Sequence, residues 1–418
     1  MAIYKAGVVG AGTMGAGIAQ VISYTGIPVI LKEIDKQALE RGLSTIRKVY
    51  DGRVAKGRMT PQEMEEKLKL VTPTTSFDPF QDVDLVIEAV PELIKIKLEI
   101  FKTLDGICSE GAILATNTSA LSISGLASAT KRPERVIGMH FFYPAHVMKL
   151  VEVIPGLETS DGTVEETVSF AESLRKIPVK VKECPGFLVN RLLMPYLNEA
   201  LFCLQEGACG PDGKAMGIQE IDQAMKGLGW PMGPFTLIDA LGMDICAEAG
   251  KVLWEGYGER MRPAELWVRL LEMKRFGRKS GRGFYDYSAA APTEPGKPDE
   301  ELNRAITDLQ RKTGRNGTRF SMDRLMYLMI NEAVLALQEG ISSASEIEMA
   351  VLAGLGYSPS KGGLLHTADA MGIDTLVDGL DKWTKELGFR YHPAYRLRTM
   401  RNAGQLGVKT KKGFFTYA

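Results

Sequence analysis

The sequence predicts a parallel α/β domain that is followed by two related all-α domains. Three observations support this fold class. A glycine-rich turn separates a short apolar strand from a helix at the start of the chain. Short apolar strands then alternate with helical segments up to about residue 184, which is typical of a parallel sheet. Beyond that point helical patterns dominate, and one set of motifs occurs twice.

The length and composition exclude several classes of protein. The 418 residues suffice for two or three domains, and 51 basic residues balance 51 acidic ones. We therefore expect no nucleic-acid partner. No apolar run approaches the roughly 20 residues of a membrane span, and the first strand leaves no room for a signal peptide. Five cysteines without a CxxC motif favour reduced thiols, so we expect a cytoplasmic protein that does not bind membranes.

The start of the chain has the order strand, turn, helix and strand, at 6–9, 10–15, 16–25 and 28–31. The turn consists of Gly10, Ala11, Gly12, Thr13, Met14 and Gly15. This GxGxxG spacing lets the backbone approach a pyrophosphate at a helix N-terminus. Glu33 follows about 20 residues later, where a carboxylate can bind the adenosine ribose and repel a 2′-phosphate. The unit predicts a Rossmann-type domain that binds NAD rather than NADP.

Polar residues follow two further predicted strands, at 84–90 and 112–116. Glu92, Asn117 and Ser119 come shortly after the ends of these strands. Ligands of open α/β sheets bind beyond the carboxyl ends of the strands, so we expect these side chains to face the dinucleotide crevice. Ser119 could equally be the N-cap of the next helix.

Basic residues, among them Lys56, are frequent on the helices predicted at 36–57 and 61–69. Such residues most often form a solvated helix face. The alternative is an anchor for a substrate that carries phosphate groups. The sequence alone leaves both interpretations open.

A histidine and a glutamate lie in a predicted strand–turn–strand segment, 136–154. His140 ends the apolar run 136–139, and Glu152 lies inside the run 150–154. A carboxylate among β-branched residues is unfavourable unless it is paired. A hairpin-like return would bring Glu152 beside His140 and orient the imidazole, the side chain best suited to act as a base near neutral pH. A lone histidine is more often structural, but the two residues together predict a catalytic pair.

The helical half contains a repeat. The segment 190–207 recurs at 323–340, and the segment 239–285 recurs at 369–415. We place domains at 1–184, 185–287 and 319–418, with a linker at 288–318. Asn190 corresponds to Asp323, and no dinucleotide domain precedes the second copy, so we interpret the second copy as structural. Asn190 itself could also be a helix cap. No cluster of residues has the spacing of metal ligands.

Nearly the whole chain resembles the L-3-hydroxyacyl-CoA dehydrogenase family. The motifs that carry the resemblance are GAGTMGAGIAQ at 10–20, NTS at 117–119, HFF at 140–142, MKLVEV at 148–153, PGFLVNR at 185–191 and PMGP at 231–234. The doubled C-terminal domain is similar to the dehydrogenase part of multifunctional fatty-acid oxidation proteins. Because the sequence begins at the dinucleotide strand, we expect no hydratase domain in it.

This resemblance implies oxidation of an L-3-hydroxyacyl-CoA to a 3-oxoacyl-CoA with NAD, or the reverse reaction. It implies that His140 is the catalytic histidine, that Glu152 is its partner, and that Ser119 and Asn190 hold the substrate oxygens. Lys56 matches a contact to CoA. The positions that match cofactor contacts, besides the glycine-rich turn, are Glu33, Ala89, Glu92, Lys97, Asn117, Ser119 and Lys279.

One position departs from the family pattern. The family usually has Asn, or in some branches Ser, after the HFF motif, whereas this chain has Tyr143. A cofactor contact at this position is therefore not carried over, and the larger side chain would reshape the acyl pocket.

The resemblance also implies partners, namely an acyl-CoA thioester and a separate enoyl-CoA hydratase or thiolase. In single-copy relatives the helical domains pair across a dimer. We therefore expect either a monomer in which the two copies form an internal pseudo-dimer, or a homodimer.

Two alternatives remain at this stage. β-Hydroxyacid dehydrogenases that act on free acids share the glycine-rich start but use a catalytic lysine, and the matching segment 185–191 contains none. The other alternative is a non-catalytic relative that retains the fold for structure or NAD binding alone. The presence of His140, Glu152, Ser119 and Asn190 disfavours it.

Overall fold

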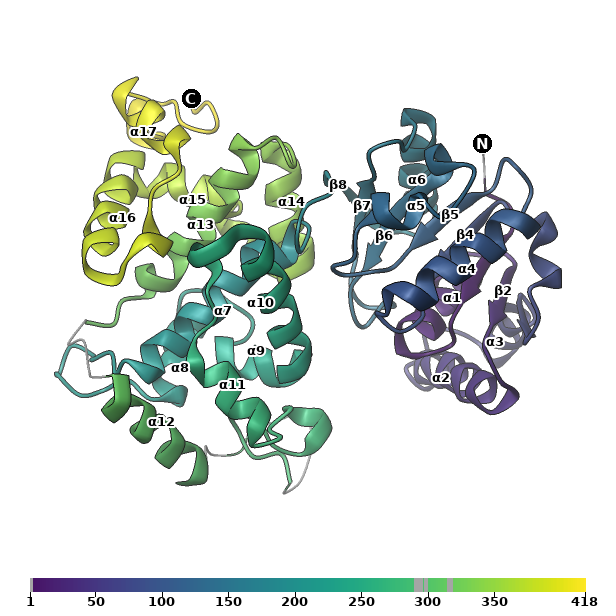
Figure 1. Cartoon of the computed structure of the whole chain (residues 1–418), viewed down its shortest axis with the longest axis horizontal. Helices are drawn as coiled ribbons and strands as arrows, with labels where there is room; N and C mark the ends of the chain where they lie inside the picture. Colours follow the sequence, from purple (N-terminus) through teal and green to yellow (C-terminus); the bar gives the residue numbers. More distant parts are fainter. Residues whose placement is uncertain (1–2, 289–295, 297–299, 314–318) are drawn as a thin grey trace. The chain divides into compact units, whose positions relative to one another are not determined.

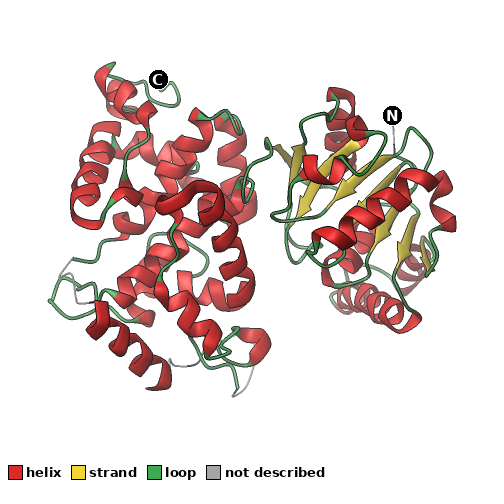
Figure 2. Cartoon of the chain, in the orientation of Figure 1, coloured by secondary structure: helices red, strands yellow, loops and turns green. Residues whose placement is uncertain are grey.

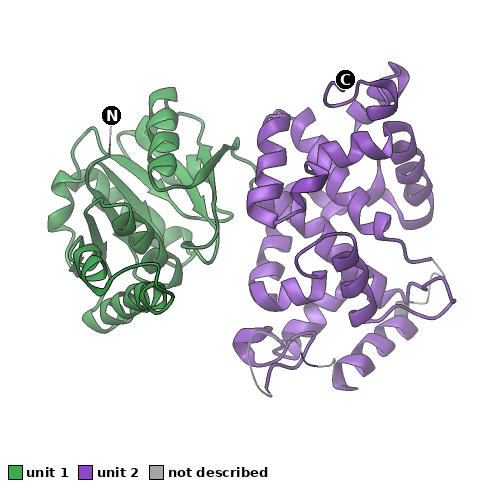
Figure 3. Ribbon diagram, turned by 180° about the vertical axis from the view of Figure 1, so that it is seen from behind, with its two compact units in different colours: residues 1–187 green, residues 188–418 purple. Residues whose placement is uncertain are grey.

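The computed structural model describes residues 3–288, 296, 300–313 and 319–418. The chain divides into two compact units, residues 1–187 and residues 188–418 (Figure 3). We call them unit 1 and unit 2 and describe each by itself. No helix in the described part of the chain is long and apolar enough to cross a membrane.

Unit 1 is built on an eight-stranded sheet with the order β3-β2-β1-β4-β5-β6-β7-β8 (Figure 1). The strands are β1 (Ala6–Val9), β2 (Val29–Lys32), β3 (Val71–Thr74), β4 (Leu85–Glu88), β5 (Ile113–Thr116), β6 (Val136–Phe141), β7 (Leu150–Pro155) and β8 (Ile177–Lys180). Neighbouring strands are parallel except β6 and β7, which are antiparallel. This order has its topological switch point between β1 and β4, where dinucleotides bind in Rossmann-type folds.

Helices cover the sheet of unit 1 (Figure 2). They are α1 (Thr13–Tyr24), α2 (Lys36–Ala55), α3 (Pro61–Leu68), α4 (Ile94–Ile107), α5 (Ile123–Ala127) and α6 (Asp161–Ser173). Strands β1, β4 and β5 are buried along their whole length, because helices pack on both faces of a parallel sheet. These three strands could be predicted from the sequence because each lies in a continuous apolar run.

The structure corrects several predicted boundaries. Helix α1 begins at Thr13 rather than at residue 16, because the second half of the glycine-rich turn already forms its first turn, with Gly12 as the N-cap. Strand β3 was missed altogether. It is an edge strand with two exposed residues and Pro73, so it lacks the apolar run of a buried strand.

Unit 2 is all helical. Its helices are α7 (Val189–Gln205), α8 (Ile218–Gly227), α9 (Pro234–Leu241), α10 (Met243–Tyr257), α11 (Glu265–Glu272), α12 (Glu300–Thr313), α13 (Met322–Gln338), α14 (Ala344–Leu355), α15 (Leu364–Met371), α16 (Ile373–Leu387) and α17 (Tyr395–Asn402). Helix α12 lies inside the segment that was predicted to be a linker. It buries Leu302, Ile306 and Leu309 at helical spacing, and Gln310 Nε2 donates to the carbonyl of Leu204 at 2.7 Å. Of the predicted linker, 288–318, the structure describes residues 288, 296 and 300–313.

The repeat seen in the sequence has the same hydrogen bonds in both copies. Asp239 accepts the backbone N–H groups of Phe284 and Tyr285 at 2.9 and 3.0 Å. Its counterpart Asp369 accepts those of residues 414 and 415 at the same distances. The two copies are therefore versions of one helical domain, with matching contacts as well as matching motifs.

The two copies pack through α7 and α13 and exchange buried ion pairs. Arg191 binds Glu332 at 2.8 Å, and the equivalent Arg324 binds Glu199 at 2.6 Å. Arg390 binds Glu199 as well, at 2.8 Å. Burial by itself raises the pKa of Glu199, but Arg390 and Arg324 outweigh burial and lower this pKa. Each copy thus neutralises a carboxylate that the other copy buries.

We predict that Glu199→Gln lowers the free energy of unfolding by about 3–5 kcal/mol, because it removes the buried negative charge that binds both Arg324 and Arg390 and leaves Arg324 only Glu206 as a charge partner. Chemical denaturation followed by circular dichroism measures the change. Glu300→Gln is the matched control, since Glu300 pairs with Arg304 on the surface and its loss should barely move the midpoint. A Glu199→Gln variant as stable as the parent would contradict the assignment.

Candidate active site

His140 and Glu152 meet across the antiparallel pair β6–β7. They are directly opposite in its register, and His140 Nδ1 lies 2.7 Å from Glu152 Oε2. His140 is 7% exposed and Glu152 is fully buried. The prediction that a hairpin-like return brings the two side chains together is confirmed.

This contact decides which ring nitrogen of His140 can act as a base. An ionised carboxylate can only accept a hydrogen bond, so Nδ1 carries the proton and Nε2 presents its lone pair. The rings of Phe142 and Phe187 lie 4.5 and 5.9 Å from the imidazole, centroid to centroid. These apolar neighbours limit access of water to the pair.

Glu92 organises the turn that follows β5. Its Oε1 accepts the backbone N–H of Ser119 at 2.9 Å and also the hydroxyl of Thr118. Its Oε2 lies 3.2 Å from Lys97 Nζ. Burial by itself raises the pKa of Glu92, but Lys97 and the hydrogen bonds from Thr118 and Ser119 outweigh burial and lower it. Glu92 is therefore held ionised at the carboxyl end of the sheet.

Lys97 is buried below this turn. Its ammonium group donates to both carboxylate oxygens of Glu88, at 2.7 and 3.0 Å, and both side chains are almost fully inaccessible. The predicted contact of Lys97 with a cofactor stays a prediction, and the geometry favours an indirect effect through Glu92. Sequence reasoning missed Glu88, although a carboxylate in the apolar strand β4 is the same signal that pointed to Glu152.

Asn117 and Ser119 have different surroundings. Asn117 Oδ1 accepts the backbone N–H of Phe141 at 2.8 Å, which fixes the end of β6 next to His140. Ser119 is exposed, and it is not the N-cap of α5, because Ser122 caps that helix. Asn190, in unit 2, is half-buried and is not an N-cap either, since Leu188 holds that position of α7. The capping alternatives for both residues are therefore wrong.

The glycine-rich turn fits a dinucleotide. Gly10 has φ of +101°, and a Cβ on Gly15 would lie 1.8 Å from the carbonyl oxygen of Gly10, so neither position tolerates a side chain. A Cβ on Gly12 would meet no protein atom within 4 Å, which leaves the backbone open to a ligand. Glu33 Oε2 accepts the N–H of Ala11 at 2.7 Å and so places a carboxylate beside the turn. Residues 10–15 and Glu33 would thus hold NAD, and Ala89 follows β4 beside them.

Lys56 is the exposed C-cap residue of α2. It belongs to a basic cluster with Arg53 and Lys176 around the exposed His146. Burial, and then the charges of Arg53, Lys176 and Lys56, lower the pKa of His146. Within this cluster, the ammonium group of Lys176 donates to the backbone carbonyls of Ala145 and Met148.

Lys279 lies in unit 2 and donates to Asp244 at 2.7 Å. Its counterpart in the second copy, Lys409, makes the same contact with Asp374 at 2.6 Å. The ion pair is thus part of the repeated architecture of the helical domain. The predicted cofactor contact of Lys279 stays a prediction.

Comparison with known proteins agrees with this geometry. Residues 5–184 match the NAD binding domain of 3-hydroxyacyl-CoA dehydrogenase, and residues 186–287 and 320–417 match its C-terminal domain. The chain belongs to the 3-hydroxyacyl-CoA dehydrogenase family. Both helical copies match the same C-terminal domain, in agreement with the repeat.

The curated proteins that are similar to this chain include alpha subunits of fatty acid oxidation complexes. The subunit of Psychrobacter arcticus is 39% identical over 413 residues, which cover 96% of this chain and 56% of that protein. The subunit of Pseudomonas savastanoi pv. phaseolicola is 39% identical over 410 residues, 96% of this chain and 55% of its own length. The chain thus spans about half the length of the curated relatives that it matches.

Solved structures of the family are also similar to this chain. The 3-hydroxybutyryl-CoA dehydrogenase of Escherichia coli K12 has a TM-score of 0.83 and 29% identity, with 96% of this chain and 99% of that chain covered. The (S)-3-hydroxybutyryl-CoA dehydrogenase of Ralstonia eutropha has a TM-score of 0.65 and 41% identity, and it covers 69% of this chain and 100% of its own.

We predict that two glycine substitutions in the turn separate NAD binding from folding. Gly12→Ala should fold normally but weaken NADH binding by about tenfold, roughly 1.4 kcal/mol, because its methyl group occupies open space that the ligand needs. Gly15→Ala should instead lower the unfolding temperature, because its Cβ collides with the backbone of Gly10. NADH fluorescence titration and thermal unfolding measure the two effects. Equal NADH affinity of the Gly12→Ala variant and the parent would argue against the proposed fit.

Proposed function

We propose that this protein oxidises the C3 hydroxyl group of an L-3-hydroxyacyl-CoA to a ketone with NAD, or catalyses the reverse reduction. The observation that carries the proposal is the buried hydrogen bond between His140 Nδ1 and Glu152, in a chain of the 3-hydroxyacyl-CoA dehydrogenase family. The names of the similar solved structures support this substrate class.

His140 would act as the general base. Bound NAD would supply the hydride acceptor for C3. Nε2 of His140 takes the proton from the C3 hydroxyl group, and Glu152 stabilises the imidazolium that forms. In the direction of reduction, the same imidazolium returns the proton. Because Glu152 fixes the ring in one tautomer and orientation, the base needs no rearrangement before it accepts the proton.

Ser119 and Asn190 would hold the substrate oxygens. Glu92 accepts the backbone N–H of Ser119 at 2.9 Å and its hydroxyl at 3.5 Å. Because the second bond is long and Ser119 is exposed, its hydroxyl can turn to donate to a ligand instead. The amide of Asn190, at the start of α7, offers two donors. The assignment of both roles rests on the matching family motifs.

The basic cluster of Arg53, Lys56 and Lys176 would attract the phosphate groups of CoA. Arg53 also stacks over the ring of Tyr24, with its guanidinium carbon 4.2 Å from the ring centroid. That contact pre-orders the side chain, so less conformational entropy is lost when an anion binds.

The second helical copy would replace the partner subunit of a single-copy relative. The reciprocal ion pairs of Arg191 with Glu332 and of Arg324 with Glu199 support this proposal, because they join two equivalent surfaces in one chain.

Separate enoyl-CoA hydratase or thiolase enzymes would be functional partners, since their reactions yield or consume these thioesters.

We predict that His140→Ala lowers kcat by about 10²–10⁴-fold, because no side chain remains to take the proton. Glu152→Gln should lower kcat as well, since it removes the charge that stabilises the imidazolium. An assay of NADH formation over a series of 3-hydroxyacyl-CoA thioesters measures both effects, with NADP as the control cofactor. His392→Ala is the control variant, because His392 is exposed in the second copy. Full turnover by His140→Ala, or activity on free hydroxy acids alone, would refute the mechanism.

We predict that Lys56→Ala raises the KM for a CoA thioester several-fold with little change in kcat, because it weakens binding far from the reacting carbon. The effect should shrink at high salt, as expected for an exposed charge. It should vanish with a pantetheine thioester, which lacks the phosphates of the nucleotide. Lys102→Ala, an exposed lysine on α4, is the control. An identical rise of KM for the pantetheine thioester would contradict a phosphate contact.

We predict a monomer in solution, because the reciprocal ion pairs already join the two helical copies within one chain. Multi-angle light scattering across a dilution series measures the mass. An obligate dimer that persists at the lowest concentration would contradict the internal pseudo-dimer.

A further inference from the structure

Glu88 is the last residue of β4 and is fully buried. Its Oε1 accepts the backbone N–H of Val90 and the ammonium group of Lys97, both at 2.7 Å. Its Oε2 accepts Lys97 again at 3.0 Å and the hydroxyl of Thr116 at 2.7 Å. Both oxygens thus receive two donors each. An ionised carboxylate, which can only accept hydrogen bonds, matches this arrangement.

Lys97 is shared between two carboxylates. Besides its two bonds to Glu88, its Nζ lies 3.2 Å from Glu92 Oε2 and donates to the carbonyl of Val90 at 3.3 Å. Within the part of the chain that the structure describes, no other charged side chain forms an ion pair with Glu88, Lys97 or Glu92. We call these three residues the charge cluster. Two carboxylates and one ammonium group give it a net charge of −1.

The charge cluster extends from the core of unit 1 to its surface. The side chains of Glu88 and Lys97 are 0% and 1% exposed, and that of Glu92 is 36% exposed. Solvent therefore reaches the cluster only at Glu92. Charges that are partly enclosed by protein interact more strongly than charges in water, because the effective dielectric constant around them is lower. The net charge is thus able to act on a ligand bound beside Glu92.

The charge cluster also adjoins the glycine-rich turn. Glu88 is the register partner of Val9, the residue before the turn. A Cβ on Gly10 would lie 2.6 Å from the carbonyl oxygen of Ala89, the residue after Glu88. The end of β4 is therefore in close contact with the start of the dinucleotide site.

The order of the strands places the charge cluster on the nicotinamide side of that site. Glu33, which follows β2, marks the adenosine side, and His140 lies in β6. Between them the sheet continues from β1 through β4 to β5. A nicotinamide ring that exchanges hydride with a substrate at His140 is expected between the turn and His140, at the carboxyl ends of β4 and β5. Glu92 follows the first of these two ends.

The two redox forms of the cofactor differ in the charge of this ring. The nicotinamide ring of NAD⁺ carries one positive charge, whereas the reduced ring of NADH is neutral. A fixed negative charge on this side of the site therefore favours bound NAD⁺ and has little effect on bound NADH. For unit charges about 10 Å apart at an effective dielectric constant of about 20, the effect on the dissociation constant is roughly tenfold.

We propose that Glu88, Lys97 and Glu92 bias the cofactor site toward the oxidised form through their net negative charge. Glu88 is a positioning residue that holds Lys97 below Glu92. The proposal rests on NAD binding at the glycine-rich turn and not on the identity of the substrate. It assigns a function to Glu88 and Lys97, two side chains that are too deeply buried to contact a ligand themselves.

Two variants change the net charge of the charge cluster in a defined way. Glu88→Gln raises it to zero. The double variant Glu88→Gln, Lys97→Met restores the charge of the parent, because Glu92 alone then remains ionised. Exchange of a complete buried ion pair for neutral residues is often tolerated by a protein. Glu99→Gln is the matched control, since Glu99 lies exposed on the same helix as Lys97, where water screens its charge.

Isothermal calorimetry of the full chain, without substrate, measures the dissociation constants of NAD⁺ and NADH. We expect the ratio of the NAD⁺ constant to the NADH constant to rise about three- to tenfold in Glu88→Gln. In the double variant the ratio should return to within about twofold of the parent value, and Glu99→Gln should leave it unchanged. A merely structural role of Glu88 would weaken the binding of both forms equally and would not move the ratio.

An unchanged ratio in Glu88→Gln, or a raised ratio that persists in the double variant, would overturn the proposal. If thermal unfolding shows that Glu88→Gln is not folded, Glu92→Gln makes the same change of charge at a partly exposed position, and the ratio must rise in that variant. A parent protein that binds neither form would refute the cofactor assignment and this proposal together. Turnover does not enter these measurements, so an unchanged ratio leaves the proposed function unaffected.

Discussion

The register of β6 against β7 is the constraint on which the candidate active site depends. His140 and Glu152 are opposite residues of this antiparallel pair, and a slip of one residue would turn one of them to the other face of the sheet. The rest of unit 1 supports this register. Strand β5 pairs with β6 on the other side, and Asn117 binds the backbone of Phe141 at its end. The sheet thus fixes the orientation of the imidazole.

Buried carboxylates recur wherever this protein requires a fixed geometry. Glu88, Glu152 and Glu199 are each fully buried, the first two in otherwise apolar strands and the third in helix α7. Glu88 is paired with Lys97, Glu152 with His140, and Glu199 with both Arg324 and Arg390. An unpaired charge in these positions would cost several kcal/mol, so the partner must be in place in the folded state. The same physical requirement orders the turn near the cofactor, the candidate base and the contact between the two helical copies.

The two helical copies have the same architecture but different surfaces. The contacts of Asp239 and Asp369 are equivalent, as are those of Lys279 and Lys409. These shared contacts define the domain. The differences lie at positions such as Gly250 and Leu380, where one copy has a hollow and the other a packed core. The repeat thus keeps the contacts that define the domain and varies the side chains that fill it.

The sequence by itself determined much of this protein. Local patterns of apolar, glycine and charged residues can be seen directly in a single sequence. These patterns predict buried strands such as β1 and β4, the turn at residues 10–15, the acid at Glu33 and the repeat. The pairing of His140 with Glu152 was also predictable, because a carboxylate in a strand requires a partner. Sequence reasoning failed where local patterns are weak, at the edge strand β3 and at α12 within the predicted linker.

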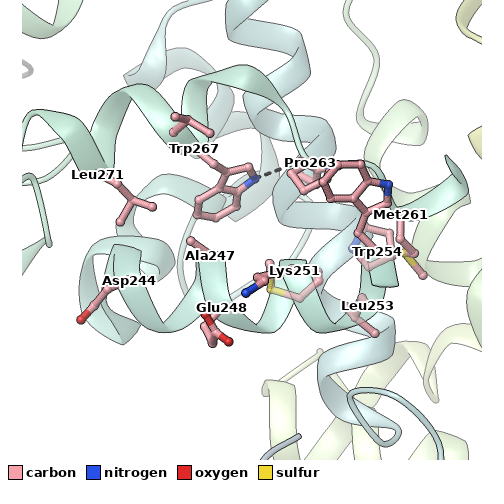
Figure 4. A pocket seen from close by; sticks show the side chains of 15 residues that line it. Asp244, Ala247, Glu248, Lys251, Leu253, Trp254, Met261, Pro263, Trp267 and Leu271 are labelled. Carbon is pink, nitrogen blue, oxygen red and sulfur yellow. Dashed lines mark hydrogen bonds between the residues drawn. The ribbon is translucent and has the colours of Figure 1, made fainter. Parts of the chain in front are cut away.

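Only the tertiary structure decided the contacts between distant residues. It placed Lys97 beneath the surface with Glu88, excluded Ser119 and Asn190 as helix caps, and joined Arg191 to Glu332. It also revealed a hollow of about 420 Å³ (Figure 4) that is lined in part by Gly250, since a hollow arises from the combined sizes of side chains on separate helices. Such features follow from packing in three dimensions, which no local pattern along the chain encodes.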